Sequence, residues 1–152
     1  MTFDRLQKTL QLIDEADAQD PRTVLVKGAP QPYELAYSQW MTDWVKRLDP
    51  NASEELLIAA RGQHLRRWEI PRDKYPDDRK GYLLWRETLK SFHAEEVGKI
   101  MRRAGYPEAS IENGLGGGIG VRVRLAIGQG LLQGIEQTGR GLLFRFGRSG
   151  SP

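Results

Sequence analysis

Residues 78–105 read DRKGYLLWRETLKSFHAEEVGKIMRRAG and predict one long helix. Asp77 or Asp78 can cap its first turn, whereas Gly105 followed by Pro107 ends it. Apolar residues recur along this segment at the spacing of one helix face, so we expect them to form a buried stripe. This predicted core stripe consists of Tyr82, Trp85, Leu89, Phe92, Val97 and Ile100.

Shorter helices are expected before this segment. The first carries apolar residues at helical spacing over 3–13 and ends near 17–20, where Pro21 stops it. The second opens at Pro32, because proline is well tolerated at the start of a helix, and Pro50 marks its exit. Both segments therefore predict amphipathic helices that pack on the long one.

Two further features complete this part of the chain. Residues 23–31 hold a β-branched run at 24–26 followed by glycine and prolines, which predicts a loop with a brief strand or turn. Asn51 and Glu54 have the spacing of a capping box and predict the start of a third helix that runs toward Trp68. The pattern as a whole predicts an all-α fold with a single helical domain.

The composition changes abruptly near residue 112. Twelve of the 17 glycines follow residue 110, and neither lysine nor aspartate occurs there. Each glycine costs a helix about 1 kcal/mol relative to alanine. We therefore expect the helical domain to cover residues 1–111 and residues 112–152 to form a Gly/Arg-rich tail. We interpret this tail as disordered or read out of frame, and a Gly-rich hairpin is the alternative.

Length and composition limit the possible functions. A chain of 152 residues suits one ordinary domain. Because it contains no cysteine, disulfides, thiolate metal sites and a cysteine nucleophile are excluded. The first residues lack the apolar core of a signal peptide, and no apolar stretch is long enough to span a membrane. We expect a cytoplasmic protein that does not associate with membranes.

Charge is distributed unevenly along the chain. Residues 1–60 hold six Lys and Arg against ten Asp and Glu, whereas residues 61–103 hold twelve against seven. Clustered cations concentrate anions near a surface. This local excess favours an anionic partner such as a phosphorylated molecule or RNA, although a solvated basic face is the plainer interpretation.

The stretch from His64 to His93 concentrates the residues that could carry chemistry. Its cations are mainly arginines, which bind phosphate and carboxylate in a bidentate manner, and they alternate with aromatic residues. The candidate ligand-binding residues are Arg66, Arg67, Trp68, Arg72, Arg79, Tyr82 and Arg86. Because Arg79, Arg86 and His93 are spaced by seven residues, we expect them to share one side of the long helix.

The two histidines are the candidate catalytic residues. Helical spacing directs His64 inward, whereas Arg66 faces outward. We expect His64 and His93 to act as acid/base groups or as ligands of a divalent metal, with a further ligand from Glu69, Glu95 or Glu96. The structural alternative is that both are hydrogen-bonded core histidines and that the aromatic residues are ordinary core residues.

Several short pieces, in order along the chain, identify a resemblance. They are Gln63-His64, Arg67-Trp68, Ile70-Pro71-Arg72, Gly81-Tyr82, Trp85-Arg86 and Phe92-His93-Ala94. Together they make the chain resemble the family known as domain of unknown function 4202, from about Phe3 through Ile111. Some members of that family carry a glutamyl-tRNA synthetase label, but this sequence lacks the nucleotide-binding signatures and the length of such a synthetase.

The same segment looks like a degenerate HD metal-dependent phosphohydrolase, which is an all-helical fold. In that pattern a His-Asp pair follows an Ala-Ala run, and a later histidine opens another helix. Here Ala59-Ala60 precede Gln63-His64, and Phe92-His93-Ala94 occupies the later position. The resemblance implies a possible divalent metal, although Gln-His replaces the His-Asp pair.

These observations lead to one functional prediction and two alternatives. We expect an HD-like helical domain that either binds a phosphorylated small molecule or nucleotide, with arginines holding the anion, or acts as a metal-dependent phosphohydrolase-like enzyme. The first alternative is an RNA- or tRNA-associated binding module, whose cations contact backbone phosphates and whose aromatics stack on bases. The second is a surface for protein contacts made by Trp and Arg.

Overall fold

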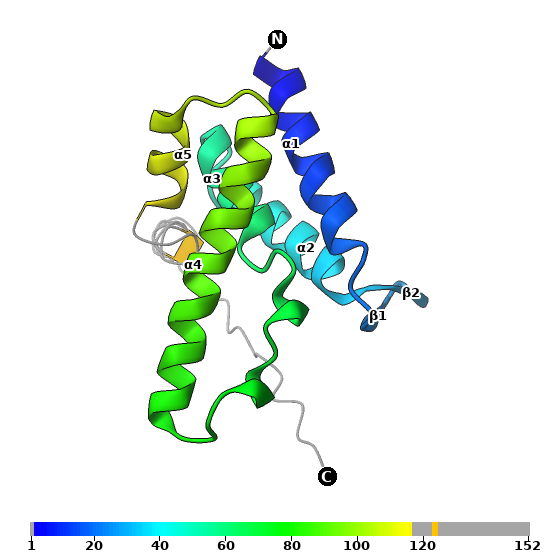
Figure 1. Cartoon of the computed structure of the whole chain (residues 1–152). Coiled ribbons are helices and arrows are strands. Elements are labelled where there is room, and N and C mark those ends of the chain that lie inside the picture. Colours follow the sequence, from blue (N-terminus) through cyan, green and yellow to red (C-terminus); the bar gives the residue numbers. More distant parts are fainter. Residues whose placement is uncertain (1, 117–122, 125–152) are drawn as a thin grey trace, which may run out of the picture.

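The long helix predicted from the sequence forms the spine of the molecule. The structure, a computed structural model, describes residues 2–116 and 123–124. The spine is α4 (Arg79–Arg103), and the helices α1 (Thr2–Asp17), α3 (Glu54–Gly62) and α5 (Glu108–Leu115) all contact it (Figure 1). The helix α2 (Tyr33–Leu48) packs mainly on α3. A mainly α-helical single domain is therefore confirmed.

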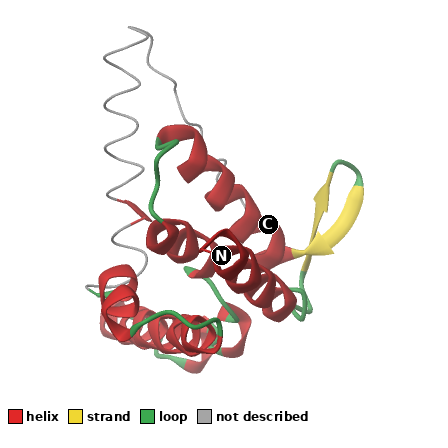
Figure 2. Ribbon diagram, turned by 90° about the horizontal axis from the view of Figure 1, so that it is seen from above, coloured by secondary structure: helices red, strands yellow, loops and turns green. Residues whose placement is uncertain are grey.

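A small hairpin connects α1 with α2. Its strands β1 (Thr23–Val26) and β2 (Ala29–Pro32) pair in antiparallel fashion and extend from one end of the helical body (Figure 2). Lys27 and Gly28 form the two-residue turn with φ values of 50° and 83°. Positive φ at both positions matches the right-handed twist of the strands. The brief strand expected between the first two helices is confirmed.

Capping determines where the helices begin and end. Asp78 accepts a hydrogen bond from the N–H of Gly81 at the start of α4, as predicted, and Gly105 ends that helix with φ of 90°. The capping box predicted at Asn51 is wrong. The side chain of Ser53 caps α3 by accepting from the N–H of Leu56, because Asn51 lies in the preceding turn, where its N–H donates to Asp49.

The core lies where α1, α3 and α4 meet. Its fully buried side chains include Ile13, Ile58, Leu65, Val97 and Met101. A Cβ atom at Gly62 would lie 2.5 Å from Cγ2 of Val97, so glycine permits the close approach of α3 to α4 there.

The predicted core stripe of α4 is wrong at one position. Tyr82 is 43% exposed, and its neighbours Leu83 and Leu84 are exposed as well, because the first turns of α4 extend past the body of the domain. Trp85, Leu89, Val97 and Ile100 are buried, as expected from their spacing, and Phe92 is half-buried.

The helix α5 crosses the boundary expected between residues 111 and 112. Its residues Ile111, Gly114 and Leu115 are buried, and the Cα of Gly114 lies close to Glu55 of α3. Packing against α3 therefore offsets the low helix propensity of glycine at this position. The tail that we interpreted as disordered or read out of frame covers residues 112–152. Of these, 112–115 belong to α5 and Val123 is fully buried in the core, whereas residues 117–122 and 125–152 lie outside the described residues.

Within the described part of the chain, no helix combines the length and the apolar character that a membrane span requires.

Candidate anion-binding site

The structure brings the two histidines together. The helix α3 ends at Gly62, so His64 lies in the turn that follows it rather than on the helix itself. His93 lies on the buried side of α4 and is 5% exposed. The centroids of the two imidazole rings are 6.1 Å apart. The packing of α4 beside the turn after α3 thus creates one histidine pair from residues distant in the sequence.

Hydrogen bonds fix the tautomer of His64. Its Nδ1 lies 3.2 Å from Oε2 of Glu34, and its Nε2 lies 3.1 Å from Nη1 of Arg67. A guanidinium nitrogen can only donate, so Nε2 must accept the bond from Arg67. The proton then resides on Nδ1, which donates it to Glu34. The ring of Tyr37 stacks on that of His64 at 4.3 Å and 5°, which holds its plane.

Burial keeps both imidazoles neutral. It lowers the pKa of His64 below 6.5, although the hydrogen bond and the charge of Glu34 partly oppose this shift. The pKa of His93 falls to about 3, mainly because of burial and secondarily because His64 and Arg67 lie nearby. The Nε2 atom of His93 is buried and has no hydrogen-bond partner among the described residues. Such an atom requires a polar contact from a water or a ligand.

Glu34 is held from its other side by an ion-pair network. Its Oε1 accepts from Nη2 of Arg22 at 2.9 Å, and its backbone N–H donates to Asp20 at 3.0 Å. Arg22 also donates to both oxygens of Asp20 at 3.0 Å. Burial alone would raise the pKa of Asp20, but the hydrogen bonds from Arg22 and Glu34 outweigh it, and the pKa lies below its usual value. The network anchors the charge that faces His64.

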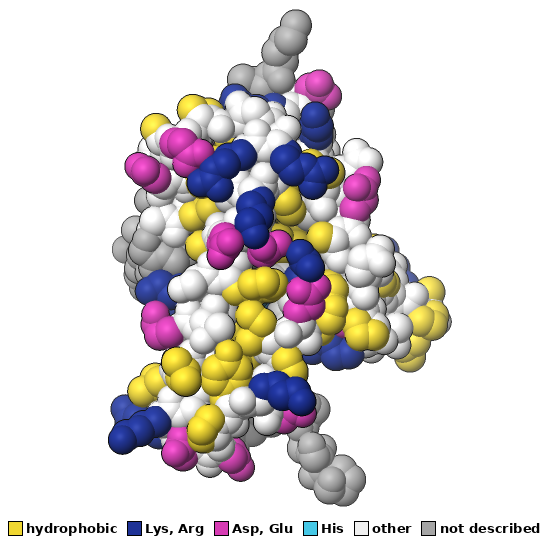
Figure 3. Space-filling view, viewed as in Figure 1, with side chains coloured by type: hydrophobic (Ala, Val, Ile, Leu, Met, Phe, Trp, Pro, Cys, Tyr) yellow, Lys and Arg dark blue, Asp and Glu magenta, His cyan; other side chains and the backbone are white. Residues whose placement is uncertain are grey.

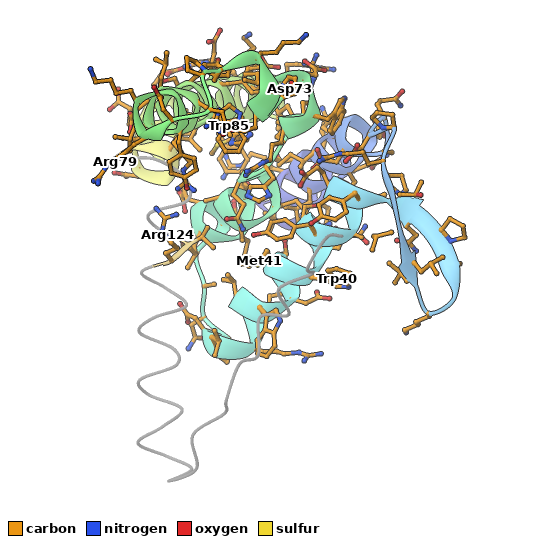
Figure 4. The ribbon with its side chains drawn as sticks, turned by 90° about the horizontal axis from the view of Figure 1, so that it is seen from below. Trp40, Met41, Asp73, Arg79, Trp85 and Arg124 are labelled. Atoms are coloured by element: carbon orange, nitrogen blue, oxygen red, sulfur yellow. The ribbon has the colours of Figure 1, made fainter. Side chains whose placement is uncertain are left out.

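A cavity of about 340 Å³ opens beside Arg67. Three arginines and two tryptophans dominate its walls, which consist of Arg22, Arg67, Trp68, Ile70, Pro71, Arg72 and Trp85. Figure 4 shows Trp85 pointing from α4 toward the other helices. Its indole N–H donates to the carbonyl of Ile70 at 2.8 Å, and the guanidinium of Arg67 lies 4.9 Å from its ring centroid.

Arg67 differs from the other two arginines of this cavity in its partners. Arg22 is paired with carboxylates, as described above, and Arg72 donates to the carbonyl oxygens of Tyr75 and Pro76 at 3.1 and 2.9 Å. No carboxylate among the described residues lies within 4 Å of Arg67. Burial lowers its pKa, although the charge of Glu34, beyond the 4 Å limit of an ion pair, partly opposes this shift. Arg67 is thus a partly desolvated cation without an ion-pair partner in that part of the chain.

Arg66, which we also predicted to bind the ligand, lies elsewhere. It faces outward, as expected, and pairs with Glu69 and Glu96, each at 2.8 Å. Together with residues of α1 and α4 it lines a different groove. The structure does not bring Arg66 into the cavity of Arg67.

The remaining candidates lie along the exposed part of α4. Arg86 is exposed, and its guanidinium lies 5.9 Å from the ring centroid of Tyr82, which in turn lies 6.1 Å from that of Trp85. Arg79 is exposed at the first residue of the helix (Figure 4). We expected one side of α4 to carry Arg79, Arg86 and His93. Of these three residues only His93 is buried, where α4 meets the body of the domain.

The carboxylates proposed as further metal ligands have other partners. Glu69 and Glu96 pair with Arg66, and Lys99 contacts Glu95 and Glu96 at 3.1 and 2.8 Å. Among residues 2–116 and 123–124, no group of three or more His, Asp or Glu side chains could hold a metal ion. These residues therefore supply no third ligand for the metal that we predicted at His64 and His93.

Sequence reasoning missed four residues of the site. They are Asp20, Arg22, Glu34 and Tyr37. A signal for Glu34 existed, because Glu34, Ser38 and Thr42 follow one another at intervals of four and form a buried polar stripe on α2. A polar stripe on the inward face of a helix indicates a hydrogen-bonded interior.

Fold and site together define a mainly α-helical protein with an arginine-lined cavity beside a histidine pair. The chain belongs to the family described as domain of unknown function (DUF4202), whose model matches residues 7–114. The family resemblance found in the sequence is thereby confirmed. No curated protein and no solved structure matches the chain.

Proposed function

We propose that the cavity lined by Arg22, Arg67 and Arg72 binds the anionic group of a phosphorylated small molecule. The observation that carries this proposal is Arg67, a partly buried guanidinium without a carboxylate partner among the described residues. Burying an unpaired charge is costly, and an anion in the cavity would offset that cost. Phosphate suits the site because its oxygens match the planar fork of arginine.

The local charge supports an anion with more than one negative charge. Asp20 and Glu34 more than neutralise Arg22, so the three guanidiniums and two carboxylates of this region leave an excess of one positive charge. Arg72 has one carboxylate nearby, that of Asp77 at 3.9 Å, which is fully exposed and therefore only a weak partner. Arg86 adds to the positive field, since its charge lowers the pKa of both His64 and Arg67. A phosphate monoester complements this excess.

The size of the cavity favours a small ligand. Its volume of about 340 Å³ falls in the range of roughly 300 to 1,000 Å³ typical of small-molecule sites. Trp68 and Trp85 supply apolar wall beside the arginines. Such a wall can contact the organic part of the ligand while the guanidiniums hold its phosphate.

Calorimetric titration of the full chain tests this proposal. The probes are inorganic phosphate, ribose 5-phosphate and adenosine monophosphate, each titrated into wild type, Arg67→Gln and Arg66→Gln. Arg66→Gln is the matched control, because it removes a neighbouring guanidinium by the same substitution. We expect Arg67→Gln to weaken binding about tenfold or more, as for loss of a charged hydrogen bond, and Arg66→Gln to change it less than about twofold. Absence of saturable binding, or equal loss in both variants, would overturn the proposal.

Salt dependence separates this function from the RNA-binding alternative. Binding to an RNA backbone through six to ten phosphates loses roughly 10³ to 10⁵ in affinity between 50 and 200 mM salt. A single phosphate in a cavity should lose only a small factor. Tight binding of a single-stranded RNA with the steep dependence, weakened equally by Arg66→Gln and Arg67→Gln, would favour the RNA alternative instead.

A further inference from the structure

We infer that the site also hydrolyses phosphate monoesters, with Nε2 of His64 as the base that takes a proton from the attacking water. This inference rests on the proposed binding of a phosphorylated molecule in the arginine-lined cavity and adds a reaction to it. Three properties of the His64 environment carry the argument: its orientation, its position relative to the anion, and its protonation state.

The orientation of His64 is that of a positioned base. Glu34 is 1% exposed, and its carboxylate accepts from Nδ1 of His64 at 3.2 Å while Arg22 holds its other oxygen at 2.9 Å. A carboxylate in this position fixes the tautomer and stabilises the imidazolium that forms when Nε2 takes a proton. Stacking on Tyr37 fixes the ring plane. The basic nitrogen is therefore Nε2, which points toward Arg67.

The bond between Nε2 and Arg67 places the base next to the bound anion. Nη1 of Arg67 lies 3.1 Å from Nε2, and the same guanidinium lines the cavity. A guanidinium carries five N–H donors, so the others can hold a phosphate, while His64 lies behind Arg67 and is not itself part of the cavity wall. Turning of Nη1 toward the phosphate frees the lone pair of Nε2. His93 presents a second buried ring nitrogen beside His64, without a partner among the described residues.

Burial keeps the base available at neutral pH. Because the pKa of His64 lies below 6.5, its Nε2 carries no proton near pH 7. The nearby positive charges that help to lower this pKa are those of Arg67 and Arg86, while Glu34 opposes them. A base that is unprotonated at the working pH needs no prior proton loss.

The reaction balances with water as the only co-substrate. The water oxygen attacks phosphorus while Nε2 of His64 takes one of its protons. The bond between phosphorus and the ester oxygen breaks, and its electron pair leaves with that oxygen. The proton on His64 then passes to the leaving group or to solvent. The products are inorganic phosphate and the alcohol or phenol, and Arg22, Arg67 and Arg72 stabilise the charge on the phosphoryl oxygens.

Hydrolysis of p-nitrophenyl phosphate by the full chain in the presence of EDTA tests this inference. Its nitrophenolate leaving group needs no proton, so the assay isolates the base. We expect turnover by wild type and a loss of kcat of about 100-fold or more in His64→Gln, the usual size of a general-base contribution. Glutamine can keep both hydrogen bonds of His64, so phosphate binding should change only a few-fold. Arg66→Gln is again the matched control and should retain wild-type kcat.

A second variant tests the positioning role of Glu34. The kcat/KM of wild type should rise with pH across the lowered pKa of His64 and level off above it. In Glu34→Gln this acid limb should move to lower pH, because the charge that raises the pKa of His64 is gone, and kcat should fall. A merely structural role for Glu34 would lower activity without moving the limb.

The outcomes separate this inference from the proposed function. Saturable phosphate binding without turnover would overturn hydrolysis and leave the binding function intact. Turnover that persists in His64→Gln, or that EDTA abolishes, would also overturn the role of His64. Absence of phosphate binding would overturn both.

Discussion

Arg66 and Arg67 are neighbours in the chain, but their side chains line two different cavities. Arg66 adopts a left-handed conformation with φ of 55°, its side chain is 38% exposed, and two carboxylates neutralise it. Arg67 turns toward the cavity, where His64 and Trp85 are its contacts. The left-handed residue reverses the local chain direction, so two consecutive side chains diverge. An identical residue type thus becomes a surface ion pair in one position and a candidate ligand-binding group in the next.

The groove on the Arg66 side shows the same contrast on a larger scale. Its volume is about 500 Å³, and its walls are Leu12, Ala16, Leu65, Arg66, Glu96, Lys99, Ile100, Arg102 and Arg103. Figure 3 shows Lys and Arg side chains gathered over α1 and the upper part of α4, with hydrophobic side chains between them. Here Arg66, Lys99 and Arg102 all pair with glutamates. Arg103 in this groove also has no carboxylate partner among the described residues, but it is exposed. The proposed site therefore rests on the combination found at Arg67, a half-buried cation without such a partner.

The largest expected effect is on the pH dependence of stability and comes from Asp17, which contacts the backbone of Arg66. Asp17 is fully buried, and one of its oxygens accepts the backbone N–H of Arg66 at 3.1 Å. Burial raises its pKa to about 7; the hydrogen bond from Arg66 opposes this shift, and Glu34, Asp14 and Asp20 add to it. The folded pKa exceeds the unfolded value of 3.8, so the stabilisation is complete below pH 3.8 and lost as pH rises through 7.

Asp17→Asn should remove this pH dependence. Asparagine keeps an oxygen for the N–H of Arg66 but does not ionise. Relative to the variant, wild type should lose about 4 kcal/mol of unfolding free energy between pH 4 and pH 8, from 1.36 kcal/mol per pKa unit. Urea unfolding of both proteins at pH 4, 6 and 8 measures the difference. Parallel stability curves for wild type and variant would show that Asp17 titrates as an ordinary carboxyl.

The next effect concerns His93, which lies near Arg67, and here stability falls as the pH is lowered rather than raised. The pKa of His93 falls from 6.5 to about 3, so its neutral ring stabilises the fold fully above pH 6.5. That stabilisation is lost as pH falls toward 3, because the unfolded state takes up the proton first. Relative to His93→Gln, wild type should lose roughly 3 kcal/mol between pH 7 and pH 4.5. Urea unfolding at these two pH values tests this, and an unchanged difference would contradict it.

Local chemistry explains why most helices could be predicted from the sequence. Pro21 and Pro50 follow the ends of α1 and α2, Pro32 directly precedes the first residue of α2, and Gly105 supplies a left-handed end to α4. These effects act over a few residues and need no tertiary information. The helix over 108–115 was not predicted because Gly114 and the glycine-rich sequence that follows argue against it, and only the close packing of Gly114 on α3 reveals why it forms.

The site depends on contacts that no local rule predicts. His64 and His93 were found as candidates because they are the only histidines, and their meeting required the packing of α4. Glu34 looked like an ordinary acidic residue in the first turn of a helix, and its partner His64 is 30 residues away. The divergence of Arg66 and Arg67 arises from a left-handed arginine, which the sequence does not signal because glycine usually takes that conformation.

A smaller effect sharpens the comparison at Arg67 itself. Arg67→Gln should change the free energy of unfolding by less than about 1 kcal/mol, because relief from burying an unpaired charge offsets the lost cation–π contact with Trp85. The same variant should bind phosphate about tenfold or more weakly. Thermal unfolding with and without ribose 5-phosphate measures both properties: the ligand should raise the Tm of wild type clearly more than that of the variant. A large loss of stability without ligand would instead assign Arg67 a structural role.

The smallest effect concerns Arg66. Its ion pairs with Glu69 and Glu96 are partly exposed, so Arg66→Gln should lower the free energy of unfolding by less than about 1 kcal/mol at low salt. In 1 M NaCl the Debye length shrinks to about 3 Å, and the difference from wild type should nearly vanish. Urea unfolding at both salt concentrations tests this expectation. If the loss exceeded about 2 kcal/mol or persisted in salt, Arg66 would be as desolvated as Arg67, and the contrast between the two neighbours would fail.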